Sequence, residues 1–141
     1  MLQRIQTIWL LLASACGFSM YRVTLFEAIL PNNTYYRLSA TESLLLFAVI
    51  ISIAILSLIA VFLFKKRPLQ GRIVIIGIIL SVAAIGLEVL EINSYKSSVS
   101  ITKGTYSWGG LLPILMAVLL ILAARGIYKD EKLVRSLDRL R

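Results

Sequence analysis

The chain of 141 residues contains no histidine and only one cysteine, Cys16, and these absences exclude several kinds of chemistry. One cysteine can form neither a disulfide within the chain nor a redox-active thiol pair. Without histidine, the usual zinc sites and histidine-ligated haem are excluded as well. The sequence also lacks a glycine-rich phosphate-binding loop and a nucleophile elbow. We therefore expect no enzymatic activity, no cofactor and no metal site.

Charge is also scarce, because only 16% of the residues are charged while 59% are hydrophobic. The mean hydropathy is +0.88, whereas an ordinary globular chain has about a quarter of its residues charged. A net charge of +8 would suggest nucleic-acid binding in a soluble protein. Here the basic residues flank apolar runs, where they would face lipid headgroups. The composition predicts one integral membrane domain over residues 1–141, with the lipid bilayer and not nucleic acid as its partner.

Long apolar runs predict four membrane-spanning helices, each of which needs about 20 mostly apolar residues. The clearest run is residues 43–64, which contains no charge, and residues 73–90 and 108–128 follow it. The first run, residues 5–21, also resembles an export signal, with "ASAC" as a lipoprotein cleavage site before Cys16. Its purely apolar core is shorter than an export signal requires. We expect a retained helix, and processing at Cys16 is the alternative.

The positive residues predict the orientation, because cytoplasmic segments of membrane proteins carry an excess of Lys and Arg. Eleven of the 15 lie at the N-terminus, in the short turn after residue 64 and in the C-terminal tail, and four lie in the two other connections. Both termini are therefore predicted to be cytoplasmic. The short turn makes the second and third spans antiparallel neighbours. The two other connections are longer, and residues 91–108 alternate around Gly104 in a hairpin-like pattern that is compatible with short outer strands.

Glu88 and Glu91 are the only acidic residues that border an apolar run, and their spacing of three places them on one face of a helix. An ionisable residue in a membrane segment indicates a functional site, for example a cation site or a proton relay. Both residues lie at the outer end of the third span, where water can reach them. An interfacial cap or a salt bridge with a loop Lys or Arg is therefore the simpler interpretation.

Small residues recur at a spacing of four, which allows helices to approach each other closely. The pairs are Ala13 with Gly17, Ala48 with Ser52, and Gly77 with Ser81. We expect them to serve packing within the bundle, and a dedicated oligomer interface is the alternative.

The tail, residues 129–141, predicts a short amphipathic helix on the cytoplasmic side. Its apolar stripe consists of Leu133, Val134, Leu137 and Leu140. Such a helix can lie on the membrane surface or on the protein's own inner turn, or its stripe can dock on a partner.

Three segments together resemble one family: "MLQRIQTIWLLLA", "FLFKKRPLQGR" and "YKDEKLVRSLDRLR". They are similar to the small membrane proteins of Bacteroidota that are catalogued as domain of unknown function 4293. The resemblance implies an all-helical, four-span bundle in the bacterial inner (plasma) membrane, with no established activity, substrate or cofactor.

Taken together, these features favour a non-enzymatic accessory or scaffold subunit of a larger membrane complex. Such a protein would pack in the membrane, in that complex or as a homo-oligomer, and dock through its outer loops or its tail. The alternative is a small transporter or channel-like protein for an ion or a lipid, with Glu88 and Glu91 at its outer mouth. A transport pathway needs several polar residues in each helix, and the spans contain mainly isolated Ser and Gly.

Overall fold

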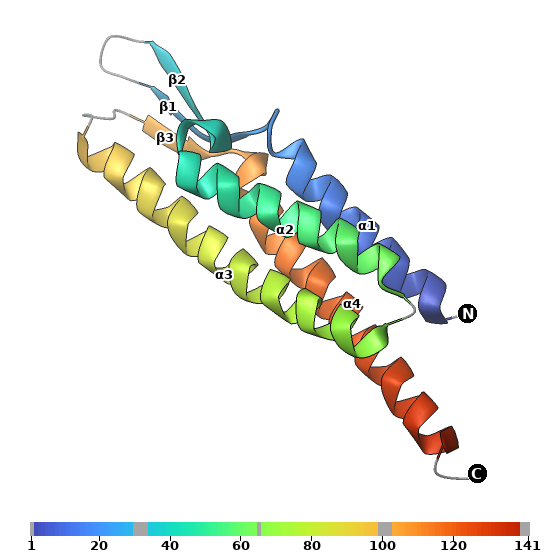
Figure 1. The fold of residues 1–141 in the computed structure, drawn as a ribbon. Helices are drawn as coiled ribbons and strands as arrows, with labels where there is room; N and C mark the ends of the chain where they lie inside the picture. Colours follow the sequence, from blue (N-terminus) through green and yellow to red (C-terminus); the bar gives the residue numbers. More distant parts are fainter. Residues whose placement is uncertain (1, 30–33, 65, 99–102, 139–141) are drawn as a thin grey trace.

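The computed structural model describes residues 2–29, 34–64, 66–98 and 103–138, which form four long helices and a small sheet (Figure 1). The α-helices are α1 (Leu2–Ser19), α2 (Leu44–Phe62), α3 (Arg67–Ser98) and α4 (Leu112–Asp138). Short 3-10 turns precede α2 at Ala40–Glu42 and α4 at Trp108–Leu111.

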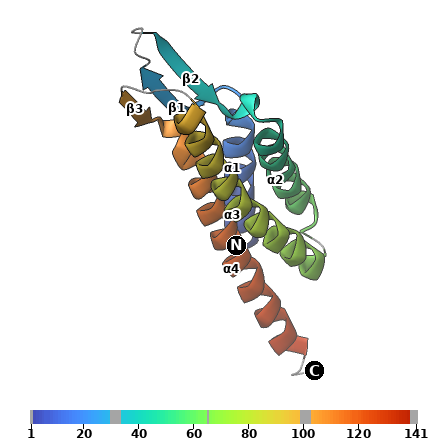
Figure 2. The ribbon, with the colours of Figure 1, turned by 90° about the vertical axis from the view of Figure 1, so that its left-hand side faces the viewer.

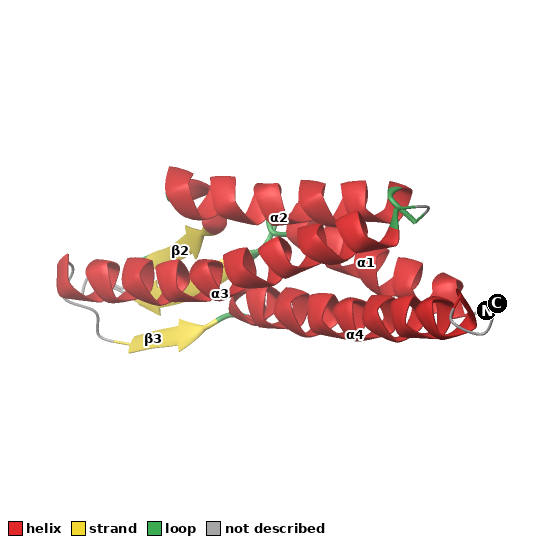
Figure 3. Ribbon diagram, turned by 60° about the horizontal axis from the view of Figure 1, so that its bottom comes forward, coloured by secondary structure: helices red, strands yellow, loops and turns green. Residues whose placement is uncertain are grey.

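The four helices form a bundle in which each helix packs against its neighbours in the sequence and α4 closes on α1 (Figures 1 and 2). The turn between Phe62 and Arg67 makes α2 and α3 antiparallel neighbours, which confirms the prediction from its short length. The core between the helices is apolar, and its fully buried side chains include Leu10, Ile50, Met116 and Leu120. α1 begins and α4 ends at the end of the bundle that lies away from the sheet (Figure 3).

Three segments are long and apolar enough to cross a membrane: Leu44–Phe62, Arg67–Ser98 and Trp108–Val134. The described apolar part of α1, Ile5–Ser19, is shorter. Large apolar side chains are exposed on the outer faces of all four helices, as Ile8, Phe62, Ile79 and Val118 illustrate. A surface of this kind is unfavourable in water and suits contact with lipid.

Two of the three pairs of small residues lie where helices meet. Ala13 and Gly17 are buried on α1, and a Cβ atom added to Gly17 would lie 2.7 Å from the Cβ atom of Ala54 on α2. Gly77 and Ser81 are buried on α3. The third prediction is wrong, because Ala48 and Ser52 are exposed on α2, where the Ser52 hydroxyl donates to the Ala48 carbonyl over 2.7 Å.

The third apolar run forms a longer helix than predicted. Residues 91–98, which we expected to begin an outer connection, are the last turns of α3. This segment contains neither Pro nor Gly to end the helix, and Ile92 within it is buried. At 32 residues, α3 is about 48 Å long and exceeds a hydrocarbon core of about 30 Å. Its last turns therefore reach the sheet.

The tail is not a separate amphipathic helix, because α4 continues unbroken from Leu112 to Asp138. No proline follows Pro113, and the residues after Tyr128 are mostly good helix formers, so nothing interrupts the helix. α4 thus projects past the other helices along its own axis (Figure 1). Leu133 and Val134 are exposed on this projection. Leu140 lies outside the described residues, as does the side chain of Leu137.

The two long connections meet in a three-stranded antiparallel sheet that caps the bundle (Figures 1 and 3). Its strands are β1 (Thr24–Ile29), β2 (Tyr35–Ser39) and β3 (Lys103–Tyr106), in the order β2-β1-β3. Short strands are therefore present in both connections, and among the described residues β3 pairs with β1 of the first connection. Phe26 lies opposite Tyr106 in this pairing, and Ala28 lies opposite Gly104.

The sheet has a small apolar core of its own, which holds it to the end of α3. Phe26, Ala28 and Leu38 of the sheet are buried together with Ile92 of α3. Beside them, the ring of Tyr36 stacks on that of Tyr95, with 4.7 Å between the ring centroids. The extension of α3 and the cap thus stabilise each other.

Candidate functional site

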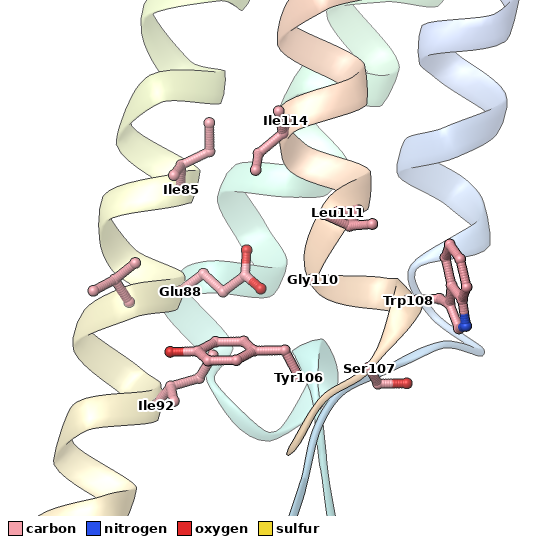
Figure 4. A pocket seen from close by; sticks show the side chains of 10 residues that line it. Ile85, Glu88, Ile92, Tyr106, Ser107, Trp108, Gly110, Leu111 and Ile114 are labelled. Carbon is pink, nitrogen blue, oxygen red and sulfur yellow. The ribbon is translucent and has the colours of Figure 1, made fainter. Parts of the chain in front are cut away.

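Glu88 is the described side chain whose position most needs an explanation, because it is 5% exposed and sits in an apolar cleft. Its carboxylate points from α3 towards Gly110 in the turn before α4 (Figure 4). The cleft measures about 500 Å³. Its walls are Ile85, Val89 and Ile92 of α3, then Tyr106, Ser107 and Trp108, and then Gly110, Leu111 and Ile114.

Because Gly110 has no side chain, the Glu88 carboxylate can occupy the space beside it. A Cβ atom added to Gly110 would lie 2.8 Å from Oε1 of Glu88, which is closer than such atoms pack. No hydrogen bond or ion pair joins Glu88 to another side chain in the described parts of the chain. Its carboxylate is open to the cleft, because no fully buried side-chain oxygen among the described residues lacks a partner. A carboxylate that faces mostly apolar side chains is less well solvated than one on the surface, so a partner for its charge would stabilise it. Residues of this kind mark functional sites.

Glu91 lies in a different environment, although it is only one turn further along α3. Its carboxylate accepts a hydrogen bond of 2.6 Å from the hydroxyl of Ser43, the residue that caps the start of α2. It lines a second cavity of about 320 Å³ together with Glu42 and Tyr95. The structure therefore does not bring Glu88 and Glu91 into one site. Glu91 joins α3 to the start of α2, which agrees with a capping role.

The sequence suggested a salt bridge between Glu88 or Glu91 and a Lys or Arg of a loop. Among the described residues, neither carboxylate forms one. An ion pair in the described part of the sheet joins Glu27 to Arg37 instead, and their atoms Oε1 and Nε lie 3.4 Å apart across β1 and β2. Both side chains are largely exposed, so this pair contributes little to stability.

Tyr36 and Glu42 form a hydrogen bond at the edge of the second cavity. The phenol hydroxyl of Tyr36 donates to Oε2 of Glu42. This hydrogen bond to a carboxylate, together with partial burial, raises the pKa of Tyr36 from 10.0 to about 12. The bond thus holds β2 to the turn that leads into α2.

A polar cluster that sequence reasoning missed lies at the opposite end of the bundle. The Gln6 side-chain amide donates a hydrogen bond of 2.8 Å to Oδ2 of Asp130, and both residues are buried. Nη1 of Arg67 donates to the backbone carbonyl of Asp130 over 3.4 Å. Gln70 is buried nearby and donates to the carbonyl of Ala60 over 2.9 Å. These contacts tie the four helices together where α4 leaves the bundle.

The spacing along α4 could have revealed Asp130. The buried residues Met116, Leu120, Ala123, Ile127 and Asp130 follow one another at intervals of four and three, which is the spacing of a helix face that packs on its neighbours. Asp130 continues this buried face, although it is a charged residue in the tail.

The described residues contain no group of three or more His, Cys, Asp or Glu side chains that could hold a metal ion. Cys16 is a free, half-buried thiol on α1. The Glu88 cleft therefore holds the strongest candidate group in the described chain.

Comparison with known proteins gives one match. No match was found among curated proteins or among solved structures. The family model described as Domain of unknown function (DUF4293) matches residues 2–140. This match covers nearly the whole chain and confirms the resemblance that the two terminal segments and the basic turn suggested. The protein belongs to the DUF4293 family.

Proposed function

We propose that this protein is a non-enzymatic accessory or scaffold subunit of a larger membrane complex, which docks through the projecting end of α4. The observation that carries the proposal is the unbroken course of α4 past the bundle as far as Asp138. On this projection Leu133 and Val134 are 49% and 41% exposed. Apolar side chains on a helix that is otherwise charged are typical of a face that lies in a partner's groove.

The experiment is affinity purification of the full-length, tagged protein from gently solubilised membranes, followed by mass spectrometry and native gel analysis. A docking role predicts that the Leu133→Ser, Val134→Ser double variant loses its co-purifying proteins. The Lys129→Ser, Lys132→Ser double variant changes two exposed residues of the same helix segment and serves as the matched control. A wild-type protein that migrates only as a free monomer would count against the proposal.

We further propose that α1 to α4 all cross a bacterial inner membrane, with both termini in the cytoplasm. The support is the charge asymmetry of the sequence: eleven of the 15 positive residues belong to the segments at the end where α1 begins and α4 ends. The positive-inside rule assigns such an end to the cytoplasm. The cap formed by β1, β2 and β3 then faces the periplasm.

A transporter for an ion or a lipid is the second candidate, and the unpaired carboxylate of Glu88 favours it. The bundle core favours the accessory role instead. Between Glu88 near one end and Asp130 at the other, the core holds mainly apolar side chains such as Ile53, Met116 and Leu120. Its buried serines include Ser57 and Ser81, whose hydroxyls donate to carbonyls of their own helices. An ion pathway needs a polar lining. Flux measurements with the purified protein in liposomes separate the two roles, since ion or lipid flux that Glu88→Gln abolishes would favour the transporter.

A further inference from the structure

The Glu88 cleft lies between the outer ends of α3 and α4, at the level where the bundle meets the sheet (Figure 4). Tyr106 and Trp108 line it and are 58% and 84% exposed. Aromatic residues with this exposure are typical of the membrane interface. If the helices cross a membrane as proposed above, the cleft lies at the depth of the lipid headgroups and the upper acyl chains.

The walls of the cleft are apolar apart from a few groups. Ile85 and Val89 on α3 face Ile114 on α4, and these three side chains form a path along the two helices. Ile114 and Val89 are both 47% exposed, so the path is open at the side of the bundle. Sites of about 300 to 1,000 Å³ hold small ligands or parts of larger ones. The cleft therefore suits a headgroup and the upper part of an acyl chain.

The charge of Glu88 is not balanced by the cation closest along the same helix. Lys96 lies two turns further along α3, and its Nζ is placed over the rings of Phe26 and Tyr106, at 5.1 and 4.9 Å from their centroids. It also donates to the Tyr106 hydroxyl over 3.5 Å. Lys96 is thus held at the sheet. No Lys or Arg is among the described residues that line the cleft, so the Glu88 carboxylate is free to bind a cation that enters it.

We propose that the cleft binds a membrane lipid with a primary ammonium headgroup, such as phosphatidylethanolamine. The ammonium group donates hydrogen bonds to the Glu88 carboxylate, and one acyl chain lies along Ile85, Val89 and Ile114. Hydrogen bonds between an ammonium N–H and a carboxylate are about twice as strong as neutral ones. A quaternary ammonium headgroup has no N–H to donate and fits the site less well. This role is independent of docking through α4.

The test is native mass spectrometry of the full-length protein reconstituted in vesicles with equal amounts of phosphatidylethanolamine, phosphatidylcholine and phosphatidylglycerol. We expect the wild type to retain one phosphatidylethanolamine molecule in preference to the other two lipids. Glu88→Gln should lower this retention about tenfold, the effect of losing one charge-assisted hydrogen bond. Glu27→Gln makes the same chemical change on the exposed face of β1 and should leave retention unchanged.

A second variant keeps the proposal testable if Glu88→Gln fails to fold. Ile114→Trp fills the apolar path from an exposed position and leaves the carboxylate in place, so it should also lower the retention of phosphatidylethanolamine. Equal retention of phosphatidylethanolamine and phosphatidylcholine by the wild type would overturn the proposal, as would unchanged retention by Glu88→Gln and Ile114→Trp. Loss of co-purifying proteins in the Leu133→Ser, Val134→Ser variant tests the docking role separately.

Discussion

The Gln6 amide donates a hydrogen bond of 2.8 Å to the Asp130 carboxylate, and so joins the first and last helices across 124 positions of sequence. Both side chains are more than nine-tenths buried. A buried polar group that loses its partner destabilises a protein more than the bond itself stabilises it. The pair therefore fixes how α1 and α4 meet at the end of the bundle from which α4 projects.

Replacing Gln6 with Leu should destabilise the protein by about 1–3 kcal/mol, because Asp130 then remains buried without its side-chain partner. Thermal unfolding in detergent, followed by circular dichroism, measures the effect. Replacing Asp130 with Leu as well should recover much of the loss, since removing both partners leaves no unpaired polar side chain. A double variant as unstable as the sum of the two single variants would contradict this account.

Gly17→Ala should also be destabilising, because the added Cβ atom would lie 2.7 Å from the Cβ atom of Ala54 and force α1 and α2 apart. Overpacking of this kind destabilises by about 1–3 kcal/mol. Gly86→Ala is the matched control, because a Cβ atom at Gly86 meets nothing within 4 Å. In this control, the better helix propensity of alanine should leave stability unchanged or slightly raised. The two variants can be compared by their unfolding temperatures in the same detergent.

The apolar runs predicted the helices well where the exposed and the core-facing positions are both apolar. The charge-free run at residues 43–64 became α2, Leu44–Phe62, almost without adjustment. The end of α3 at the sheet was not predictable in the same way. Ile92 and Tyr95 remain helical there while they pack against β1 and β2, strands that lie more than 50 positions away.

The site was predictable only in part, because contacts between helices determine which side chains come together in it. Glu88 could be recognised from its place at the end of an apolar run. The sequence did not show that Glu88 and Glu91 lie in separate environments. A spacing of three leaves two side chains about 60° apart around a helix. On α3, which packs between α2 and α4, that angle directs Glu91 to Ser43 and Glu88 to Gly110. Asp130 was missed because its partner, Gln6, is at the other end of the chain.

The hydrogen bond from Tyr36 to Glu42 should make this tyrosine resist ionisation. Its pKa is raised from 10.0 to about 12, so its contribution to stability is complete below pH 10.0 and is lost as the pH rises towards about 12. Titration of the tyrosinate absorbance should therefore show a late step near pH 12 that Tyr36→Phe removes, whereas Tyr95, whose pKa is also raised by burial and by Glu42, should still titrate above its ordinary value. Tyr35→Phe, at a neighbouring and 80% exposed position, is the control and should leave that step in place. Loss of the late step in both variants would contradict the assignment.

Cysteine labelling in cells can test the proposed orientation of the bundle. In a Cys16→Ser background, Thr34→Cys places a thiol just before β2 and Lys129→Cys places one near the projecting end of α4. Both original residues are exposed, so each thiol should be reactive where reagent reaches it. If the excess of positive residues holds the ends of the chain in the cytoplasm, a maleimide that does not cross the inner membrane should label Thr34→Cys in cells with a permeabilised outer membrane. Lys129→Cys should react only after the inner membrane is opened.

Labelling of Lys129→Cys before that step would contradict the proposed orientation. The cap and its Glu88 cleft would then lie on the cytoplasmic side of the membrane.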